Sequence, residues 1–571
     1  MKKLAAILFI FIPLACSAAG PWYAAPGGGA AASCVDATTN VCTVDRARVV
    51  ASDGETIILA PGKYSASELG ASGYLLISSE NLTLQCSGER FSCIFQPSAA
   101  GAISGIRLNS PTTTAFTWDG IKIDTSEAVG GVDQCFYLSD GAATYSYTIK
   151  NTYCTDTKFY DIRQEANEAN GTITDNEYYT TTEIAPYSFY NMVATATTGT
   201  ISILRNIVNM SKVNVGGKAI VNISPTAGGP TVDIENNVFN SFVDPEATGS
   251  GNHNGIYIQN ISNAVIKNNS VLVRGNYGAR ASIGISCGST AAVSSDNCLI
   301  QENTVYNGTT SGQALQIGSD LTSSGNGFAT NGKIIKNKVF CETDNTDTHG
   351  SLYGWSPGGE IRGNYFKNCG YGAISKEQTT GAIISSNIVD GCWLIGLYSK
   401  GSASAKMVGN GINVTNSNCS PIYLGVNSAS GTNSTNAYIY NNNIDANGAK
   451  PTDLLFSAAS QTIAEASNNN WTGFSSIQFT YLGVAYTSLT TWNAVGVVRT
   501  DMSTPPLYSE RSAQTLWDRF KIQPTSSLYH AGIANSYQKV DFNGRPFYMW
   551  GPTIGPYEFT SGFKAKERTP R

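Results

Sequence analysis

The chain has 571 residues, of which 41% are hydrophobic and only 13% are charged, and its formal net charge at pH 7 is −5. A chain with so few Lys and Arg residues and no basic run does not favour nucleic acid as a partner. Beyond its first twenty residues, no stretch comes near the 18 consecutive apolar residues that suggest a membrane-spanning helix, so no integral membrane segment is expected.

Residues 1–19 are predicted to be a secretory signal peptide. Two lysines precede an apolar run from Leu4 to Leu14, and small residues follow it. The alternative is a lipoprotein signal that ends at Cys16, although Pro13 stands where such a signal usually has Leu. Both readings predict a protein that is secreted or held at the cell surface.

The cysteines predict disulfide bonds. Twelve of the 13 lie after the signal segment, and an even number in an exported chain indicates pairing in an oxidising compartment. Neighbours in the sequence suggest six pairs, namely Cys34 with Cys42, Cys86 with Cys93, Cys135 with Cys154, Cys287 with Cys298, Cys341 with Cys369, and Cys392 with Cys419. The pairing among the last four stays open, because Cys341, Cys369 and Cys392 occupy similar places in their repeats.

Residues 20–110 are expected to form an N-terminal cap and the first coils of a repeat. A Gly-rich turn follows Trp22, and an apolar strand leads into Pro61 and Gly62. Residues 44–51 are the candidate for a short helix that covers the open end, where unpaired backbone would otherwise be exposed.

Residues 111–470 carry a repeated motif, Ile-x-x-Asn-x-Val with apolar substitutions. Its asparagines are Asn151, Asn176, Asn206, Asn237, Asn269, Asn303, Asn337, Asn364, Asn387, Asn410 and Asn442. They lie 23 to 34 residues apart, and the apolar positions beside them alternate with period two, so the repeat is built of strands and helical repeats are not expected. A second apolar strand lies between successive asparagines, and stacked coils would place equivalent strands about 4.8 Å apart.

We expect the repeated Asn to adopt the left-handed backbone of a sharp bend and to hydrogen-bond the Asn one coil away. The whole pattern resembles the right-handed parallel β-helix proteins of the pectate-lyase-like superfamily. That resemblance implies an all-β, single-stranded right-handed parallel β-helix with caps at both ends. It does not fix the chemistry, because the superfamily includes lyases, hydrolases, esterases, epimerases and non-enzymatic spikes.

Residues 471–560 resemble the closing segment of the same secreted proteins and are expected to cap the other end. Residues 561–571 form a polar tail.

Alternation along the second strand predicts which side chains point outward. One outward column is expected to contain Tyr257, Ser286, Gln316, Tyr353, Ile374, Tyr398 and Tyr423, and its neighbour to contain Gln259, Gly288, Gly318, Trp355, Lys376, Lys400 and Gly425. The aromatic members, Tyr257, Tyr353, Trp355, Tyr398 and Tyr423, are candidate sugar-binding residues, and Arg362 is a further one. The alternative is that aromatic residues simply suit an exposed sheet.

Lys376 and Lys400 are candidate catalytic residues, because their strands align without a gap and place the two lysines one coil apart. Two close ammonium groups depress each other's pKa, which lets a lysine act as a base near neutral pH. A resemblance to the family-six lyases, the alginate and chondroitin group, implies a Lys base with an Arg one coil later. Lys400 stands where that Arg is expected, and Cys369 and Tyr371 replace the usual calcium-binding glutamates. The alternative is a pair of lysines on a solvated face.

The segment 342–349 leads into the Tyr353 strand. Asp344 and Asp347 could bind calcium, which is the one possible cofactor, and His349 could act as an acid or base at the edge of a groove. A loop or capping role is the alternative for His349.

The sequence therefore predicts a secreted carbohydrate-active protein, acting as a lyase on an acidic polysaccharide by β-elimination. The alternative is a non-catalytic glycan-binding or adhesion protein. A glycoside hydrolase is less favoured, since no two carboxylates have the spacing that retaining or inverting hydrolysis requires. The particular polysaccharide and the oligomeric state cannot be read from the chain.

Overall fold

A computed structural model describes residues 21–557 of the chain with internal gaps. The gaps are residues 31, 79–80, 99–103, 110–113, 126–132, 140–143, 156, 158–159, 166–167, 181–187, 193–197, 214–218, 226–227, 244–253, 275–282, 290–292, 309–310, 319–328, 342–346, 355–356, 377–378, 427–430, 447–452, 507, 509–519, 539 and 547–551. The predicted signal peptide and the polar tail lie outside the described residues.

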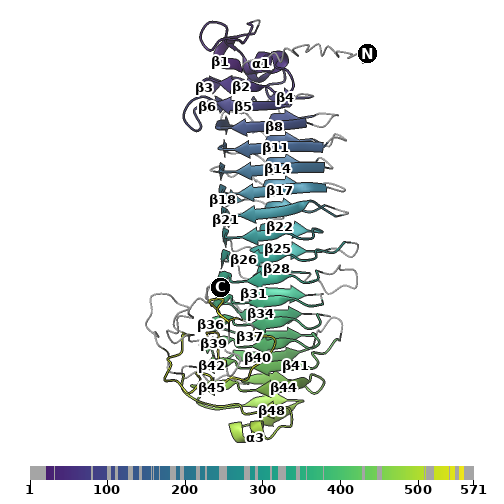
Figure 1. Ribbon diagram of the computed structural model, residues 1–571, viewed down its shortest axis with the longest axis vertical. Coiled ribbons are helices and arrows are strands. Elements are labelled where there is room, and N and C mark those ends of the chain that lie inside the picture. Colours follow the sequence, from purple (N-terminus) through teal and green to yellow (C-terminus); the bar gives the residue numbers. More distant parts are fainter. Residues whose placement is uncertain are drawn as a thin grey trace, which may run out of the picture.

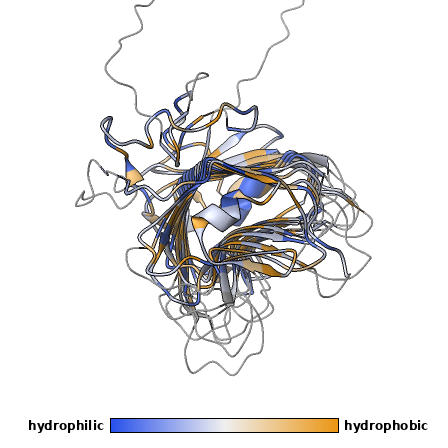
Figure 2. Ribbon diagram, turned by 90° about the horizontal axis from the view of Figure 1, so that it is seen from below, coloured by the Kyte–Doolittle hydropathy of each residue, from blue (hydrophilic) through white to orange (hydrophobic). Residues whose placement is uncertain are grey.

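The chain winds into a right-handed parallel β-helix of three sheets, here called A, B and C, and this confirms the predicted fold (Figure 1). Each coil contributes one short strand to each sheet. Figure 2 looks along the axis and shows the coils superimposed on one another. Among the named strands, only β46 and β47 pair antiparallel.

Sheet A has 17 strands. They are β1 (Trp22–Gly29), β2 (Thr56–Leu59), β5 (Leu82–Cys86), β8 (Thr114–Asp119), β11 (Thr144–Lys150), β14 (Glu168–Thr174), β17 (Thr198–Leu204), β20 (Thr231–Glu235), β23 (Val265–Lys267), β26 (Leu299–Gln301), β29 (Lys333–Ile335), β32 (Glu360–Arg362), β35 (Ile383–Ser385), β38 (Lys406–Val408), β41 (Ala437–Tyr440), β44 (Ile463–Ser467) and β48 (Val498–Arg499).

Sheet B has 15 strands. They are β3 (Gly62–Tyr64), β6 (Cys93–Phe95), β9 (Ile121–Asp124), β12 (Tyr153–Thr155), β15 (Glu177–Thr180), β18 (Ile207–Val213), β21 (Val238–Val243), β24 (Ser270–Arg274), β27 (Thr304–Gly308), β30 (Lys338–Cys341), β33 (Tyr365–Lys367), β36 (Ile388–Cys392), β39 (Gly411–Val414), β42 (Asn443–Asp445) and β45 (Asn470–Thr472).

Sheet C has 16 strands. They are β4 (Leu75–Ile77), β7 (Ser104–Leu108), β10 (Gln134–Leu138), β13 (Tyr160–Gln164), β16 (Ser188–Met192), β19 (Ala219–Ile223), β22 (Asn254–Gln259), β25 (Ile285–Gly288), β28 (Ser311–Ile317), β31 (Asp347–Gly354), β34 (Tyr371–Lys376), β37 (Ile395–Lys400), β40 (Ser420–Gly425), β43 (Leu455–Ser457), β46 (Phe479–Tyr481) and β47 (Val484–Tyr486).

Two short helices lie near the N-terminal end, and a third lies at the opposite end (Figure 1). The helix α1 (Val44–Val50) confirms the short helix predicted there, and the Thr43 side chain caps it by accepting from the Arg46 N–H. The helix α2 is Ala66–Leu69. The helix α3 (Leu489–Asn493) presents a fully buried Trp492, whose ring stacks on Phe479 at 4.6 Å between centroids.

Inward-facing apolar side chains from equivalent strands stack in columns along the axis. In sheet A one such column is Ile203, Ile234, Ile266, Ile300, Ile334, Ile361, Ile384, Met407 and Ile439, and all of these are buried. Full burial of one such side chain is worth about 1.5–3 kcal/mol. The period-two pattern of the sequence is therefore the pattern of a continuous core.

The predicted asparagine ladder is present at the corner between sheets A and B. Its members are Asn176, Asn206, Asn237, Asn269, Asn303, Asn337, Asn364, Asn387, Asn410, Asn442 and Asn469, and each donates through Nδ2 to Oδ1 of the next at 2.9–3.0 Å up to Asn469. The same Oδ1 accepts from the backbone N–H of the preceding member, as between Asn303 and Asn337. Each amide therefore joins two coils.

Two details of the ladder differ from the prediction. Asn151 is not a member, because Thr152 occupies the ladder position of its coil and its N–H donates to Asn176. The left-handed backbone belongs to the residue before each ladder Asn, as at Glu302 and Lys336, both with φ of 56°. This leaves the Asn side chain pointing inward, where it can reach the next coil.

The ladder ends in a carboxylate instead of an amide. Asn469 donates through Nδ2 to Asp501 at 3.1 Å, and the second carboxylate oxygen accepts from the indole N–H groups of Trp471 and Trp492. An Asn at 501 would present an amide N–H₂ to one of these sets of donors. Asp therefore suits this position because both of its oxygens must accept.

All six predicted disulfides are present. They are Cys34–Cys42, Cys86–Cys93, Cys135–Cys154, Cys287–Cys298, Cys341–Cys369 and Cys392–Cys419. The last two join neighbouring coils, which resolves the pairing that the sequence left open.

The C-terminal segment runs back along the outside of the coils beside β36, β39, β42 and β45 (Figure 1). Phe520 and Tyr557 pack with Tyr365 and Ile388 on the outer face of sheet B. The elements β46, β47 and α3, which belong to the earlier part of residues 471–560, lie at the far end of the coils (Figure 1). Among the described residues, no helix has the length and apolarity to cross a membrane.

The ladder gives a direct test of what holds the coils in register. We expect Asn337→Ala to lower the free energy of unfolding by about 3 kcal/mol, because it leaves buried donors of Asn303 and the Ile300 carbonyl without partners. Asn40→Ala, at an exposed loop Asn, is the matched control and should change it by less than about 0.5 kcal/mol. Chemical denaturation followed by circular dichroism measures both. Equal effects of the two substitutions would contradict the role given to the ladder.

Candidate functional site

The outer face of sheet C carries most of the residues that the sequence singled out. Strand register places Tyr257, Ser286, Gln316, Leu352, Ile374, Tyr398, Tyr423 and Phe456 in one column. The predicted column is thus confirmed except in β31, where Leu352 replaces Tyr353. Ser286, Gln316, Leu352 and Ile374 are nevertheless buried, so the column is open to solvent only above and below them.

Tyr353 was wrongly predicted to be a surface residue. It points into the lumen and is fully buried. Its hydroxyl lies 2.7 Å from the Gly358 carbonyl and 2.9 Å from the Ala329 carbonyl, and it accepts from the Gly332 N–H at 3.3 Å. The register of β31 therefore differs by one residue from the register predicted from the sequence. The three backbone groups provide hydrogen-bond partners for the phenol in the lumen.

An unbroken chain of aromatic contacts runs over four successive coils of sheet C. Ring centroids lie 6.1 Å apart between Tyr371 and Tyr398, 5.2 Å between Tyr398 and Tyr423, and 4.7 Å between Tyr423 and Phe456. All four side chains are partly exposed. We call these four residues the aromatic strip.

Two members of the aromatic strip were missed from the sequence. Tyr371 precedes Gly372 at the start of its strand and aligns with Ile395, outside the column that alternation predicted. Phe456 lies one coil beyond the last strand that could be aligned. An aromatic residue within the sheet C strand of each of four consecutive coils was the available signal.

The phenols of Tyr398 and Tyr423 stay protonated at neutral pH. Burial, together with the neighbouring Tyr423 and Tyr371, raises the pKa of Tyr398 well above its usual value. Burial and Asp453 raise the pKa of Tyr423 in the same direction. These hydroxyls can therefore donate and accept hydrogen bonds, but they do not supply a phenolate base.

Lys376 and Lys400 are neighbours in the column beside the strip, as predicted, because β34 and β37 pair Lys376 with Lys400. Lys376 is 7% exposed, whereas Lys400 is partly exposed. Lys400 follows Tyr398 by two residues on the same face, which places the two side chains roughly 7 Å apart along the strand. Of the two lysines, Lys400 is therefore the one that is partly exposed next to the strip.

His349 lies at the other end of the strands from the lysines. Its ring meets Tyr371 edge to face at 4.7 Å, and its Nδ1 lies 3.5 Å from Gln313 Nε2. The register pairs His349 with Tyr371 but Gly354 with Lys376, so the structure does not bring His349 to the lysines.

Three other predicted residues cannot be placed at the site. Asp344 and Trp355 lie outside the described residues, as does the side chain of Asp347. Gly354 occupies the position predicted for Trp355 in the lysine column.

Arg362 lies on sheet A, away from the strip, which is on sheet C. Its Nε donates to Glu360 Oε1 at 2.5 Å, and both side chains line a hollow of about 490 Å³. Arg362 therefore does not belong to the same site as the tyrosines of sheet C.

A polar cluster near the N-terminal end of sheet C was also missed. Arg107 and Arg163 lie 5.1 and 5.5 Å from the ring of Tyr137, whose hydroxyl donates to Glu165 at 2.5 Å. Burial and the neighbouring Glu165 raise the pKa of Tyr137 to about 12. Arg163 also pairs with Glu165, whereas Arg107 Nε is buried without a hydrogen-bond partner. These residues lie in successive coils, and their proximity could be recognised only once the register was known.

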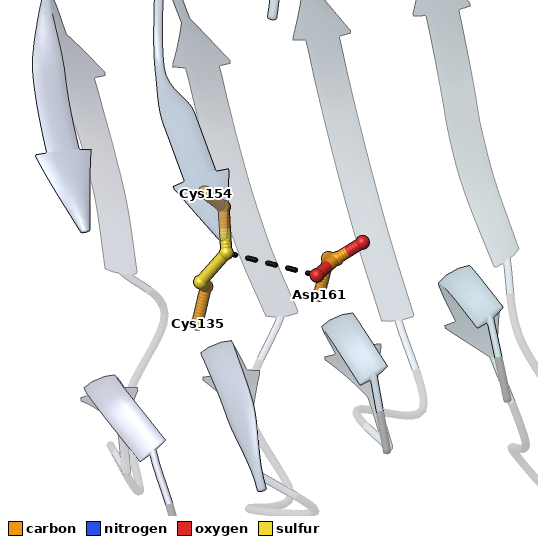
Figure 3. Close-up of side chains that lie close together, drawn as sticks. All are labelled: Cys135, Cys154 and Asp161. Carbon is orange, nitrogen blue, oxygen red and sulfur yellow. Dashed lines mark hydrogen bonds between the residues drawn. A yellow bond between two sulfur atoms is a disulfide. The ribbon is translucent and has the colours of Figure 1, made fainter. Parts of the chain in front are cut away.

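Figure 3 shows the one group of possible metal ligands among the described residues, formed by Cys135, Cys154 and Asp161. The two sulfurs are joined as a disulfide, and Cys154 Sγ lies 3.7 Å from Asp161 Oδ1. Asp161 Oδ1 also accepts from the Thr157 hydroxyl at 2.7 Å. Because a disulfide offers no thiolate, this group does not form a metal site while the bond is intact.

The chain matches no family model and no curated protein sequence. Two solved structures align with it over most of their length. The crystal structure of pectate lyase Pel9A is 13% identical in sequence and gives a TM-score of 0.25. The alignment covers 95% of this chain and 96% of the Pel9A chain. The complex of XylC with xylose is 8% identical in sequence and also gives a TM-score of 0.25. Here the alignment covers 95% of this chain and 98% of the XylC chain. A TM-score of this size carries no functional information.

Proposed function

We propose that this protein is an extracellular β-helix protein that binds an acidic polysaccharide along the outer face of sheet C. The observation that carries the proposal is the aromatic strip with Lys400 beside it. The six disulfides support an oxidising, extracellular location. The signal peptide at 1–19, the first coils at 20–110, the helix at 111–470 and the closing segment at 471–560 form part of this proposal.

The spacing of the strip suits an extended polymer. Its rings follow one another once per coil, with centroids 4.7–6.1 Å apart, so an extended polymer along the axis could contact several of them at once. Aromatic rings bind the apolar faces of sugar rings, while protonated phenols exchange hydrogen bonds with sugar hydroxyls. A ligand chain parallel to the axis would therefore meet an aromatic side chain at each coil, in equivalent positions at Tyr398, Tyr423 and Phe456.

Lys400 gives the face its preference for an anionic ligand. The protein is acidic overall, so a partly exposed ammonium group beside the strip marks a local site for a carboxylate. Lys376, one coil away, adds to the positive potential at the same place.

Binding can be measured by affinity electrophoresis in gels that contain alginate, polygalacturonate or a glycosaminoglycan. We expect retardation by at least one of these polymers, and a three- to tenfold loss of affinity for Tyr398→Ala or Tyr423→Ala. Lys400→Gln should weaken binding and reduce its dependence on salt. Tyr306→Ala is the matched control, because Tyr306 is an exposed tyrosine on sheet B. No retardation by any polymer, or equal losses for Tyr306→Ala, would contradict the proposal.

The pairing of Lys376 with Lys400 favours a second candidate function, β-elimination on the bound polymer. Lys376 would take the proton α to a uronate carboxylate while Lys400 neutralises that carboxylate. The glycosidic C–O bond breaks as the C=C bond forms, and the leaving oxygen takes up a proton, for which the Tyr398 hydroxyl is a donor on the same face. Calcium at Asp344 and Asp347 stays part of this candidate. A role for His349 stays part of it only beside Tyr371, at the other end of the strands from the lysines.

Lyase activity is read from the ultraviolet absorbance of unsaturated uronates, with and without calcium. If Lys376 is the base, Lys376→Gln should lower the rate by about 10²–10⁴. Lys400→Arg should retain more activity than Lys400→Gln, since it keeps the charge. Circular dichroism and retained polymer binding control for misfolding of the buried Lys376 variant. No absorbance change with any acidic polymer removes this candidate and leaves binding as the function.

A further inference from the structure

A second face of the molecule carries a hollow that the function proposed for sheet C does not use. It lies between sheet A and the returning C-terminal segment and has a volume of about 490 Å³. That is within the range of small-molecule sites, which hold roughly 300–1,000 Å³. A smaller hollow of about 190 Å³ near the other end of sheet A has no charged side chain in its lining.

The lining of the larger hollow has a surplus of positive charge. Lys333 and Arg362 carry two positive charges, and Glu360 carries the only negative one. Lys333 pairs in register with Glu360, and Arg362 follows Glu360 by two residues on the same outer face. In a protein of net charge −5, this arrangement favours an anion.

The Glu360 carboxylate fixes the direction of the Arg362 guanidinium. The ion pair is made through Nε at 2.5 Å, and each side chain is about one quarter exposed or less. A guanidinium held through Nε keeps its two terminal N–H₂ groups as donors, and this fork matches a carboxylate. Glu360 is then placed to accept hydrogen bonds from neutral hydroxyls of the same ligand.

The floor of the hollow is backbone. Four glycines, Gly332, Gly358, Gly359 and Gly381, come from three successive coils. A Cβ at Gly359 would lie 2.1 Å from the ring of Tyr353, so the buried tyrosine excludes a side chain there from within. A Cβ at Gly381 would lie 3.4 Å from Lys406 Nζ, on the outer side. The floor is therefore flat, and its peptide groups are paired within the stack of coils, as the Gly358 N–H is with the Thr380 carbonyl and the Gly381 N–H with the Ala403 carbonyl.

Tyr537 forms the wall of the hollow and is held in place from several sides. Lys406 Nζ lies 4.9 Å from the centre of its ring, and the Tyr438 ring lies 6.1 Å away. The segment is anchored where Asn441 Nδ2 donates to the Ile533 carbonyl at 2.9 Å and Ser386 Oγ donates to the Val540 carbonyl at 2.9 Å. The wall is thus fixed before any ligand arrives.

From this geometry we infer that the hollow binds one hexuronate unit. The carboxylate pairs with Arg362 and Lys333, one face of the sugar ring lies against the glycine floor, and Tyr537 contacts its edge. A ring that bears one carboxylate and several hydroxyls fits the combination of one surplus positive charge, a flat floor, an aromatic wall and the Glu360 carboxylate as an acceptor for hydroxyls. The site is independent of the aromatic strip, because it lies on another sheet.

Isothermal titration of the full chain with D-glucuronate and D-galacturonate tests the inference. We expect at least one of them to bind with a dissociation constant of roughly 10 mM or lower. D-Glucose and D-galactose test the need for the carboxylate, and acetate tests the need for the ring, so all three should bind at least about tenfold more weakly. Inorganic sulfate distinguishes a general anion site from a uronate site.

Variants locate the binding. Arg362→Gln should lower the affinity at least about tenfold, and Tyr537→Ala should lower it several-fold without removing a charge. Arg274→Gln, at an exposed arginine on sheet B, is the matched control and should leave it unchanged. Circular dichroism verifies that each variant folds.

Several results would overturn the inference. These are the absence of uronate binding, equal binding of the neutral sugars, acetate or sulfate, and unchanged affinity in Arg362→Gln and Tyr537→Ala. The double variant Tyr398→Ala, Lys400→Gln separates the two sites. It should bind free uronate as the wild type does even if polymer binding at sheet C is lost or never observed.

Discussion

The hydrogen bond from one ladder amide to the next is the constraint on which the rest of the structure depends. Each amide joins its coil to the next through both the side chain and the backbone N–H, so successive coils cannot slip without leaving buried polar groups unpaired. The columns of isoleucine follow from that register, and so do the columns on the outer faces. Residues 22 to 36 positions apart in sequence thus become neighbours with fixed spacing.

That register gives different chemistry to the different faces. Sheet C presents rings and an ammonium group in two adjacent columns, which suits an extended anionic polymer. Sheet B is covered in its lower half by the returning C-terminal segment, through Phe520 and Tyr557. The same segment then forms the wall of the hollow on sheet A, which suits a single charged ring. A repeat that is uniform inside can therefore hold two distinct sites outside.

The sequence was sufficient for whatever depends on period. The spacing of the asparagines and the alternation of apolar residues identified the fold, ten of the ladder positions and the adjacency of Lys376 and Lys400. The sequence was insufficient to predict which side chains face inward where two registers of a strand would bury equally apolar residues. In Ser351-Leu352-Tyr353, either Leu352 or Tyr353 could face inward, and three backbone partners of the phenol decide for Tyr353. The hollow at Arg362 was also out of reach, because Tyr537 is 175 positions away and no repeat relates the two.

Peptide mapping under non-reducing conditions tests the stacking of coils most directly. Cys341, Cys369, Cys392 and Cys419 lie in four different coils, and three pairings among them are possible. Register as described here predicts linked peptides that join Cys341 to Cys369 and Cys392 to Cys419. A link from Cys341 to Cys392 or to Cys419 in the folded protein would join coils that are not neighbours in this stack and would contradict the account.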